Sequence, residues 1–143
     1  EFRRVLFRSP DGSEGPDADG WWPTGDVAYA DDDGDLHLVD RRRDLVIVSG
    51  FNVYPYEIET VISAHPAVAE VAVIGVPDES TGETVAAYVV PIAGSGLTAG
   101  DVRELCEQRL ARFKCPTVVE IVDALPHTST GKLAKGVLRE RHR

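Results

Sequence analysis

Residues 40–59 read DRRRDLVIVSGFNVYPYEIE, and this stretch predicts a connector, a β-hairpin and the start of a helix. Its opening residues are charged, which is typical of a link between two structural units. The apolar, β-branched run that follows, the pair Ser49 and Gly50, and the short run after them predict two strands joined by a tight turn. Pro55 favours a helix start, because a missing backbone N–H costs little in the first helical turn.

The rest of the chain predicts a small α+β domain with a hairpin in front of it. Strands are expected at residues 68–76, 84–92 and 118–122, and helices at residues 99–110 and 135–141. Before the connector, two short apolar runs around an acidic, glycine-containing turn predict a further hairpin over residues 27–39. We therefore expect a sheet of about three strands flanked by helices, preceded by a β-hairpin that belongs to a larger unit.

Composition and charge argue against several classes of protein. A chain of 143 residues, 27% charged and 43% hydrophobic, suits one globular domain. The formal net charge of -9 argues against sequence-independent nucleic-acid binding, which needs clustered Lys and Arg. No apolar run approaches the roughly 20 residues of a transmembrane helix. The two cysteines are too few for a disulfide scaffold or a four-ligand zinc site, so we expect a cytoplasmic protein with free thiols.

The first nine residues, EFRRVLFRS, are what the nucleotide string GAG TTC AGA CGT GTG CTC TTC CGA TCT would encode. That string looks like a short-read sequencing adaptor, so residues 1–9 are interpreted as an artefact and left out of the fold prediction. The alternative is a genuine basic strand or amphipathic arm. The adaptor interpretation implies that the natural protein extends further upstream.

Three polar segments carry residues suited to chemistry. In Thr24-Gly25-Asp26, a carboxylate after a glycine turn can accept hydrogen bonds from the vicinal hydroxyls of a ribose, although Gly-Asp turns are also common without a function. In the charged connector, Arg41 has a planar fork that offers two directed donors, although such a cluster is ordinarily solvated surface. Near the C-terminus, PHTSTGKL places Lys132 after a glycine, but the upstream glycine of a phosphate loop is absent.

These segments, in this order and spacing, resemble the C-terminal part of the adenylate-forming (AMP-binding) enzymes. That superfamily includes the acyl-CoA synthetases, the adenylation domains of peptide synthetases and firefly luciferase. The resemblance covers about residues 10–143. It implies that residues 10–39 are the tail end of a large adenylation domain, that residues 40–44 form a hinge, and that residues 45–143 form a C-terminal lid domain. The partner of such a lid is its own N-terminal adenylation domain, which is missing from this sequence.

The resemblance also assigns roles to individual residues. Asp26 matches the aspartate that binds the ATP ribose, and Arg41 matches an arginine that contacts the ribose or phosphate. Arg43 stands at the hinge position, where the family usually has Asp or Lys, so it departs from the usual pattern. Lys132 matches the catalytic lysine of adenylation, whose ammonium group bridges the carboxylate and the phosphate oxygens as negative charge builds up.

Two further segments match the step that uses CoA. Ser49, Gly50 and Phe51 lie in a loop that, in acyl-CoA synthetases, swings into the active site beside the pantetheine, and glycine suits so close a backbone approach. Lys114 is a candidate contact for a CoA phosphate. Cys115 has no evident His partner that would make it a nucleophile. No metal site is expected, because the four His residues lack metal-ligand spacing.

Together these matches imply the C-terminal portion of an ATP-dependent acyl-CoA synthetase, most similar over residues 47–55 to fatty or medium-chain acid–CoA ligases. The implied reaction joins a small-molecule carboxylic acid to CoA through an acyl-adenylate. ATP and Mg²⁺ would be bound mainly by the missing N-terminal domain, so this fragment alone is expected to be inactive. Two alternatives stay open. One is an adenylation module or acyl-AMP ligase that loads a carrier protein, and the other is a stand-alone, non-catalytic, lid-like binding domain.

Overall fold

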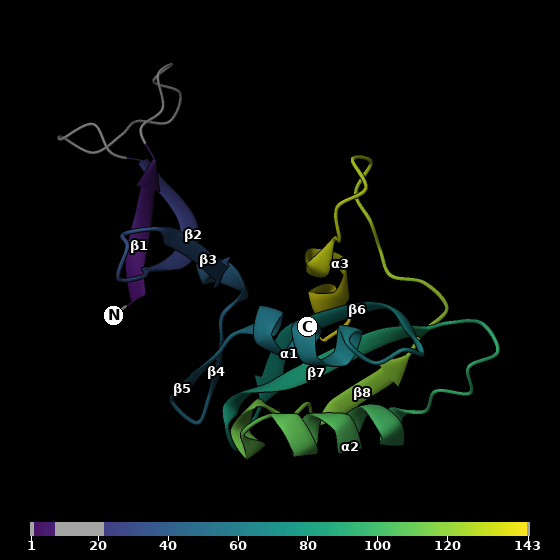
Figure 1. Ribbon diagram of the computed structural model, residues 1–143. Helices are drawn as coiled ribbons and strands as arrows, with labels where there is room; N and C mark the ends of the chain where they lie inside the picture. The colour runs from purple at the N-terminus through teal and green to yellow at the C-terminus, as the bar shows by residue number, and fades with distance from the viewer. Residues whose placement is uncertain (1, 8–21, 143) are drawn as a thin grey trace. The chain divides into compact units, whose positions relative to one another are not determined.

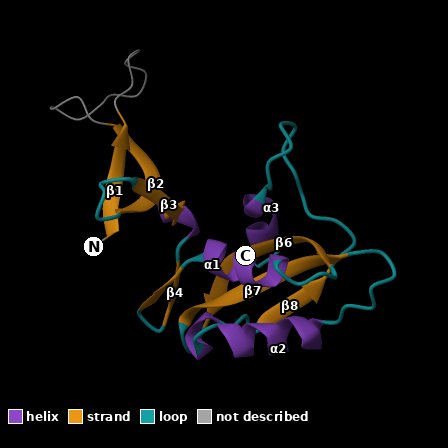
Figure 2. Ribbon diagram, viewed as in Figure 1, coloured by secondary structure: helices purple, strands orange, loops and turns teal. Residues whose placement is uncertain are grey.

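The computed structural model describes residues 2–7 and 22–142, which fall into two compact units divided between Asp44 and Leu45 (Figure 1). Residues 1 and 8–21 lie outside the described residues, as does Arg143. They include part of the predicted adaptor segment and the first part of the predicted 10–39 segment. The predicted α+β class is confirmed, with strands and helices interspersed along the second unit (Figure 2).

The first unit is a three-stranded antiparallel sheet in the order β1-β2-β3. The hairpin expected over residues 27–39 is present as β2 and β3, and its turn is held by Asp31. Oδ1 of Asp31 accepts the amides of Asp33 and Asp35 at 3.1 and 2.9 Å. A hydrogen bond with His37, together with these amides, holds the pKa of Asp31 below its usual range. The elements of this unit are β1 Phe2–Phe7, β2 Trp22–Ala30, β3 Leu36–Arg41 and the 3₁₀ helix η1 Arg42–Asp44.

Strand β1 lies inside the segment that the adaptor match assigns to an artefact. It pairs antiparallel with β2, from Phe2 opposite Tyr29 to Phe7 opposite Trp22. Pairing of this kind needs only an extended segment beside an open strand edge. The pairing therefore does not test whether these residues come from an adaptor, and that interpretation stays a prediction.

The second unit contains a five-stranded sheet in which β8 pairs parallel with β7. Strands β6, β7 and β8 are the three expected from the sequence, and the predicted β4–β5 hairpin adds two more to the same sheet. The strand order is β5-β4-β7-β6. The elements are β4 Val46–Val48, β5 Phe51–Val53, α1 Pro55–Ser63, β6 Val68–Asp78, β7 Gly82–Pro91, α2 Ala99–Arg109, the 3₁₀ helix η2 Arg112–Lys114, β8 Val118–Ile121 and α3 Lys135–Glu140.

The β4–β5 hairpin is joined to the rest of the sheet by few hydrogen bonds, although its buried valines belong to the main apolar cluster. Strand β4 pairs with β7 at a single position. The amide of Ser49 donates to the carbonyl oxygen of Thr81 at 2.9 Å. The amide of Ile47 donates to Oε2 of Glu83 at 2.8 Å, so a side chain takes the place of a strand partner there.

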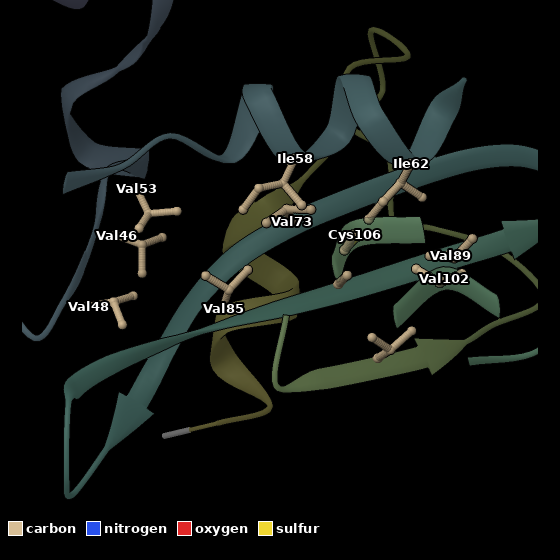
Figure 3. Packing of buried hydrophobic residues seen from close by; sticks show 12 residues of the cluster. Val46, Val48, Val53, Ile58, Ile62, Val73, Val85, Val89, Val102 and Cys106 are labelled. Atoms are coloured by element: carbon tan, nitrogen blue, oxygen red, sulfur yellow. The ribbon is translucent and has the colours of Figure 1, made fainter. Parts of the chain in front are cut away.

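Both faces of the central sheet are buried, because alternate residues of β6 and β7 enter two separate apolar clusters. On one face, Ile58 and Ile62 of α1 and Val102 and Cys106 of α2 pack over the strands (Figure 3). On the other face, α3 contributes Leu138. The buried members of that second cluster are Ala72, Ile74, Val76, Ala86, Tyr88, Leu125 and Leu138.

Candidate functional site

Asp26 and Arg41 lie opposite each other on β2 and β3 of the first unit, where they are register partners. Nε of Arg41 is 3.2 Å from Oδ1 of Asp26, and the two side chains are 54% and 23% exposed. The amide of Asp26 donates to Oγ1 of Thr24 at 3.1 Å, across Gly25, whose φ is +76°. The fold thus brings together the two residues matched to nucleotide binding. Arg41 was expected in a connector but belongs to β3, so the irregular link is confined to η1.

A hollow of about 470 Å³ beside this pair is lined by Thr24, Gly25, Arg41, Arg42 and Arg43. Its volume lies in the range of small-molecule sites. Three of the five lining residues are arginines, a residue type whose guanidinium group suits anionic oxygen atoms. Arg43 belongs to η1, the last element of the first unit, so the predicted hinge residue lies next to the division between the units.

The turn Ser49-Gly50 joins β4 to β5. The φ angles of these residues are +50° and +84°, as in the two-residue turns whose twist matches that of antiparallel strands. Ser49 is the only non-glycine residue with positive φ in the described part of the chain, so this turn holds some backbone strain. Phe51 is 56% exposed, and its ring stacks on Phe113 of η2 with 4.8 Å between centroids. The predicted CoA-step loop therefore lies against η2.

Gly50→Ala is expected to destabilise the second unit by about 1 kcal/mol, because alanine is strained in the left-handed region. An added Cβ would meet no atom within 4 Å, so the effect is one of the backbone alone. Urea unfolding of the chain measures it. Gly136→Ala is the matched control, because Gly136 lies in α3 with equally open surroundings and no positive φ. A Gly50→Ala protein as stable as the Gly136→Ala protein would contradict this account of the turn.

Lys114 lies next to Phe113 and is held by an ion pair. Its Nζ is 2.8 and 2.7 Å from the two carboxylate oxygens of Glu57, and the Lys114 and Glu57 side chains are 23% and 42% exposed. An anion that binds Lys114 must compete with Glu57 for its charge. Burial raises the pKa of the neighbouring Cys115 thiol, which disfavours the thiolate that a nucleophile needs. Burial likewise raises the pKa of the Cys106 thiol, to about 11.

Lys132 lies on a closed hairpin between β8 and α3, drawn in yellow before α3 in Figure 1. His127 and Leu133 form an antiparallel bridge at its base. The amide of Thr128 donates to the carbonyl oxygen of Lys132 at 2.7 Å, and the amide of Lys132 donates to Oγ1 of Thr128 at 3.1 Å. Gly131, at φ +80°, completes the turn. The amide and the carbonyl oxygen of Lys132 are thus both hydrogen-bonded, while the residue itself stays exposed.

A protein-family model described as the AMP-binding enzyme C-terminal domain matches residues 57–132, more than half of the chain. The chain belongs to this family. The resemblance to the adenylate-forming enzymes is therefore confirmed.

Curated relatives of this AMP-binding C-terminal domain are CoA ligases. A 3-[(3aS,4S,7aS)-7a-methyl-1,5-dioxo-octahydro-1H-inden-4-yl]propanoyl:CoA ligase of Rhodococcus jostii is 52% identical over 124 residues, which cover 87% of this chain and 24% of the relative. A long-chain-fatty-acid–CoA ligase of Yersinia pestis is 45% identical over 135 residues, which cover 94% of this chain and 24% of the relative. The chain spans about a quarter of the length of these relatives.

Solved structures share the fold. ATP-bound MatB from Rhodopseudomonas palustris matches with a TM-score of 0.82 and 46% identity, over 87% of this chain and 25% of MatB. The amide bond synthetase McbA from Marinactinospora thermotolerans matches with a TM-score of 0.85 and 37% identity, over 100% of this chain and 31% of McbA. The described residues of this domain hold no group of three His, Cys, Asp or Glu side chains that could bind a metal. None of its described helices is long and apolar enough to cross a membrane.

Sequence patterns did not indicate the roles of three residues that contact the matched segments, namely Glu57, Glu70 and His127. Glu57 pairs with Lys114, and Glu70 pairs with His127 at the base of the Lys132 hairpin. Each pair joins residues 57 positions apart. Periodicity and short motifs report only neighbours along the chain, so neither signal indicates such pairs.

Proposed function

We propose that the chain is the C-terminal portion of an ATP-dependent acyl-CoA synthetase, which converts a carboxylic acid, ATP and CoA into acyl-CoA, AMP and pyrophosphate. The observation that carries the proposal is the pairing of Asp26 with Arg41 beside an arginine-lined hollow. The resemblance to the adenylate-forming enzymes implies a role in nucleotide binding for both residues. Relatives named as CoA ligases support CoA as the acceptor. The reaction would run in two half-reactions through an acyl-adenylate.

In the first half-reaction, a carboxylate oxygen of the acid attacks the α-phosphorus of ATP and pyrophosphate leaves. Negative charge builds up where the two anions meet, and the ammonium group of Lys132 would stabilise it. The closed hairpin holds the lysine backbone, so the ordering left for the moment of reaction is that of the side chain. Asp26 would accept the ribose hydroxyls, and Arg41 would donate to the ribose or phosphate.

In the second half-reaction, the sulfur of CoA attacks the acyl carbonyl carbon, the thiol loses its proton, and AMP leaves. The turn at Ser49, Gly50 and Phe51 would lie beside the pantetheine, with Lys114 as a candidate contact for a CoA phosphate. The Lys132 hairpin and the β4–β5 turn project from different parts of the second unit (Figure 1). One orientation of this unit would present only one of them to the acyl group, so a rotation at Arg43 would exchange them.

The remaining parts of the site are assigned to an N-terminal adenylation domain. Mg²⁺ would be bound there together with the phosphates of ATP. The resemblance of residues 47–55 to fatty or medium-chain acid–CoA ligases supports such acids as substrates, and one relative is a long-chain-fatty-acid–CoA ligase. Fatty and medium-chain acids are therefore the first substrates to test.

The test uses the full-length enzyme, recovered from the upstream gene, with ATP, Mg²⁺, CoA and carboxylic acids of increasing chain length. Mass spectrometry of the products is expected to show acyl-CoA and AMP. An acyl-adenylate that accumulates without any thioester would replace this proposal with a loader of a carrier protein. The absence of both products would favour a lid-like binding domain without chemistry.

Asp26→Ala in the full-length enzyme is expected to raise the KM for ATP by about 10- to 100-fold, because hydrogen bonds to a charged group contribute about 1.5–3 kcal/mol. The sharper measurement compares ATP with 2′-deoxy-ATP in both proteins. The wild type should discriminate against the deoxy nucleotide, and the variant should lose most of that discrimination. The reason is that the 2′-hydroxyl and the Asp26 carboxylate would form one hydrogen bond, so removing the second partner costs little once the first is gone. Equal discrimination in both proteins would remove Asp26 from the ribose site.

A further inference from the structure

His127, at the base of the Lys132 hairpin, contacts two acceptors. Its Nε2 is 2.6 Å from Oε1 of Glu70, and its Nδ1 is 2.9 Å from the carbonyl oxygen of Leu125. A carboxylate and a carbonyl oxygen only accept, so both contacts are satisfied together when both ring nitrogens carry hydrogen. Glu70 belongs to β6, which pairs along its length with β7. The start of the hairpin is thereby tied to the central sheet.

The far end of the hairpin has a second anchor. Nζ of Lys135, at the start of α3, is 2.7 Å from Oε1 of Glu59 in α1. The same carboxylate oxygen accepts the amide of Val73 in β6 at 2.7 Å. Lys132 thus lies between two anchored points, one before it and one after it.

The two anchors differ in what they contribute to folding. The Lys135 and Glu59 side chains are 16% and 18% exposed, so loss of either partner would leave a poorly solvated charge. The His127 and Glu70 side chains are 37% and 41% exposed, and a polar pair so accessible to water adds little to global stability. A small misplacement of a catalytic group nevertheless costs much in rate. The exposed anchor can therefore matter for rate while it matters little for folding.

We propose that Glu70 is a positioning residue for Lys132: it holds His127, and through His127 it fixes the direction in which the hairpin presents the lysine. The inference rests on the proposed function, because it assigns the pair to the adenylation half-reaction alone. Glu70 acts through His127 and Lys132, so its removal lowers the rate of that half-reaction and leaves the thioester step unchanged.

The test compares Glu70→Ala, His127→Ala, the double variant and His127→Arg in the full-length enzyme. Adenylation is measured as acid-dependent pyrophosphate release without CoA, and the second half-reaction as CoA-dependent consumption of supplied acyl-adenylate. Each single alanine variant should lower the adenylation kcat by about 3- to 10-fold. The double variant should fall no further, and His127→Arg should recover most of the rate, because it keeps a cationic donor near Glu70.

Hydrogen exchange supplies a readout that does not depend on activity. The amides of Thr128 and Lys132 are bonded within the hairpin, so their exchange should speed up in Glu70→Ala while the urea midpoint stays unchanged. Glu104→Ala is the matched control, because it removes one partner of an exposed hydrogen bond to Gln108 in α2. That control should change neither half-reaction nor the exchange of the hairpin amides.

Two results would overturn the inference. Adenylation within twofold of wild type in both single variants would show an inert surface pair, and equal losses in both half-reactions would show a general structural role. Lys132→Ala, measured alongside, separates this failure from that of the proposed function. If wild-type adenylation depends on Lys132 but not on Glu70, the inference alone fails. If adenylation does not depend on Lys132, the inference fails together with the catalytic assignment of Lys132, while the products of the wild-type enzyme still decide the proposed function.

Discussion

Lys132→Ala in the full-length enzyme is expected to slow acyl-adenylate formation by about 10²- to 10³-fold, the usual cost of losing one preorganised group that stabilises transition-state charge. The lysine lies exposed on a hairpin whose backbone bonds do not involve its side chain. Its truncation should therefore remove the ammonium group without changing the fold. The measurement is single-turnover release of pyrophosphate from ATP in the presence of the acid.

The CoA-dependent conversion of supplied acyl-adenylate provides the internal control, and it should stay within about twofold of wild type because Lys132 is assigned to the first half-reaction only. Ser129→Ala, in the same turn, tests whether any change in the hairpin slows adenylation. A Lys132→Ala enzyme that forms acyl-adenylate at the wild-type rate would end the assignment of this lysine as catalytic.

Ile58→Ala is expected to lower the free energy of unfolding of the second unit by about 2–5 kcal/mol, the range for truncating a buried isoleucine. Ile58 is fully buried between α1 and the sheet, so alanine would leave a cavity in the larger apolar cluster (Figure 3). A loss of this size is a large share of the stability of a typical domain. Urea unfolding of the 143-residue chain, followed by circular dichroism, checks the value.

Ile92→Ala is the control of the same chemistry, because Ile92 is 47% exposed and should cost less than about 1 kcal/mol. If Ile58→Ala prevents folding altogether, Ile58→Val keeps the question measurable, with an expected loss of about 0.5–1.5 kcal/mol. Equal losses at Ile58 and Ile92 would mean that α1 does not pack on the sheet as described.

Local signals predicted most of the elements. The turn at Ser49-Gly50 follows from the short-range preference for left-handed residues between two apolar runs. The start of α1 at Pro55 follows from the free N–H positions of a first turn, and the start of α2 follows from Thr98, whose side chain forms a capping box with Asp101. Each of these turns and helix starts is determined by a few adjacent residues, so it can be predicted from a short stretch of sequence.

Choices that depend on distant partners were not predictable in the same way. In α2, the apolar spacing favours an inward face of Val102, Leu105 and Leu110, but Cys106 is fully buried while the two leucines are only partly covered. Packing of the helix on the sheet determines which residues of its apolar face are buried most deeply. The bridge that closes the Lys132 hairpin likewise pairs His127 with Leu133 across a turn. The residues around this bridge show no alternation of apolar and polar side chains that would predict a strand.

The family match ends at Lys132, but the apolar cluster on one face of the sheet does not. Leu138 of α3 belongs to the same buried cluster as Ile74 and Tyr88, and the hydroxyl of Tyr88 is hydrogen-bonded to His142. A segment that stops at Lys132 would open this face to water and leave that hydroxyl without its partner. Anyone who transplants this C-terminal domain should therefore take the junction from the physical boundary of the unit and carry the chain through His142.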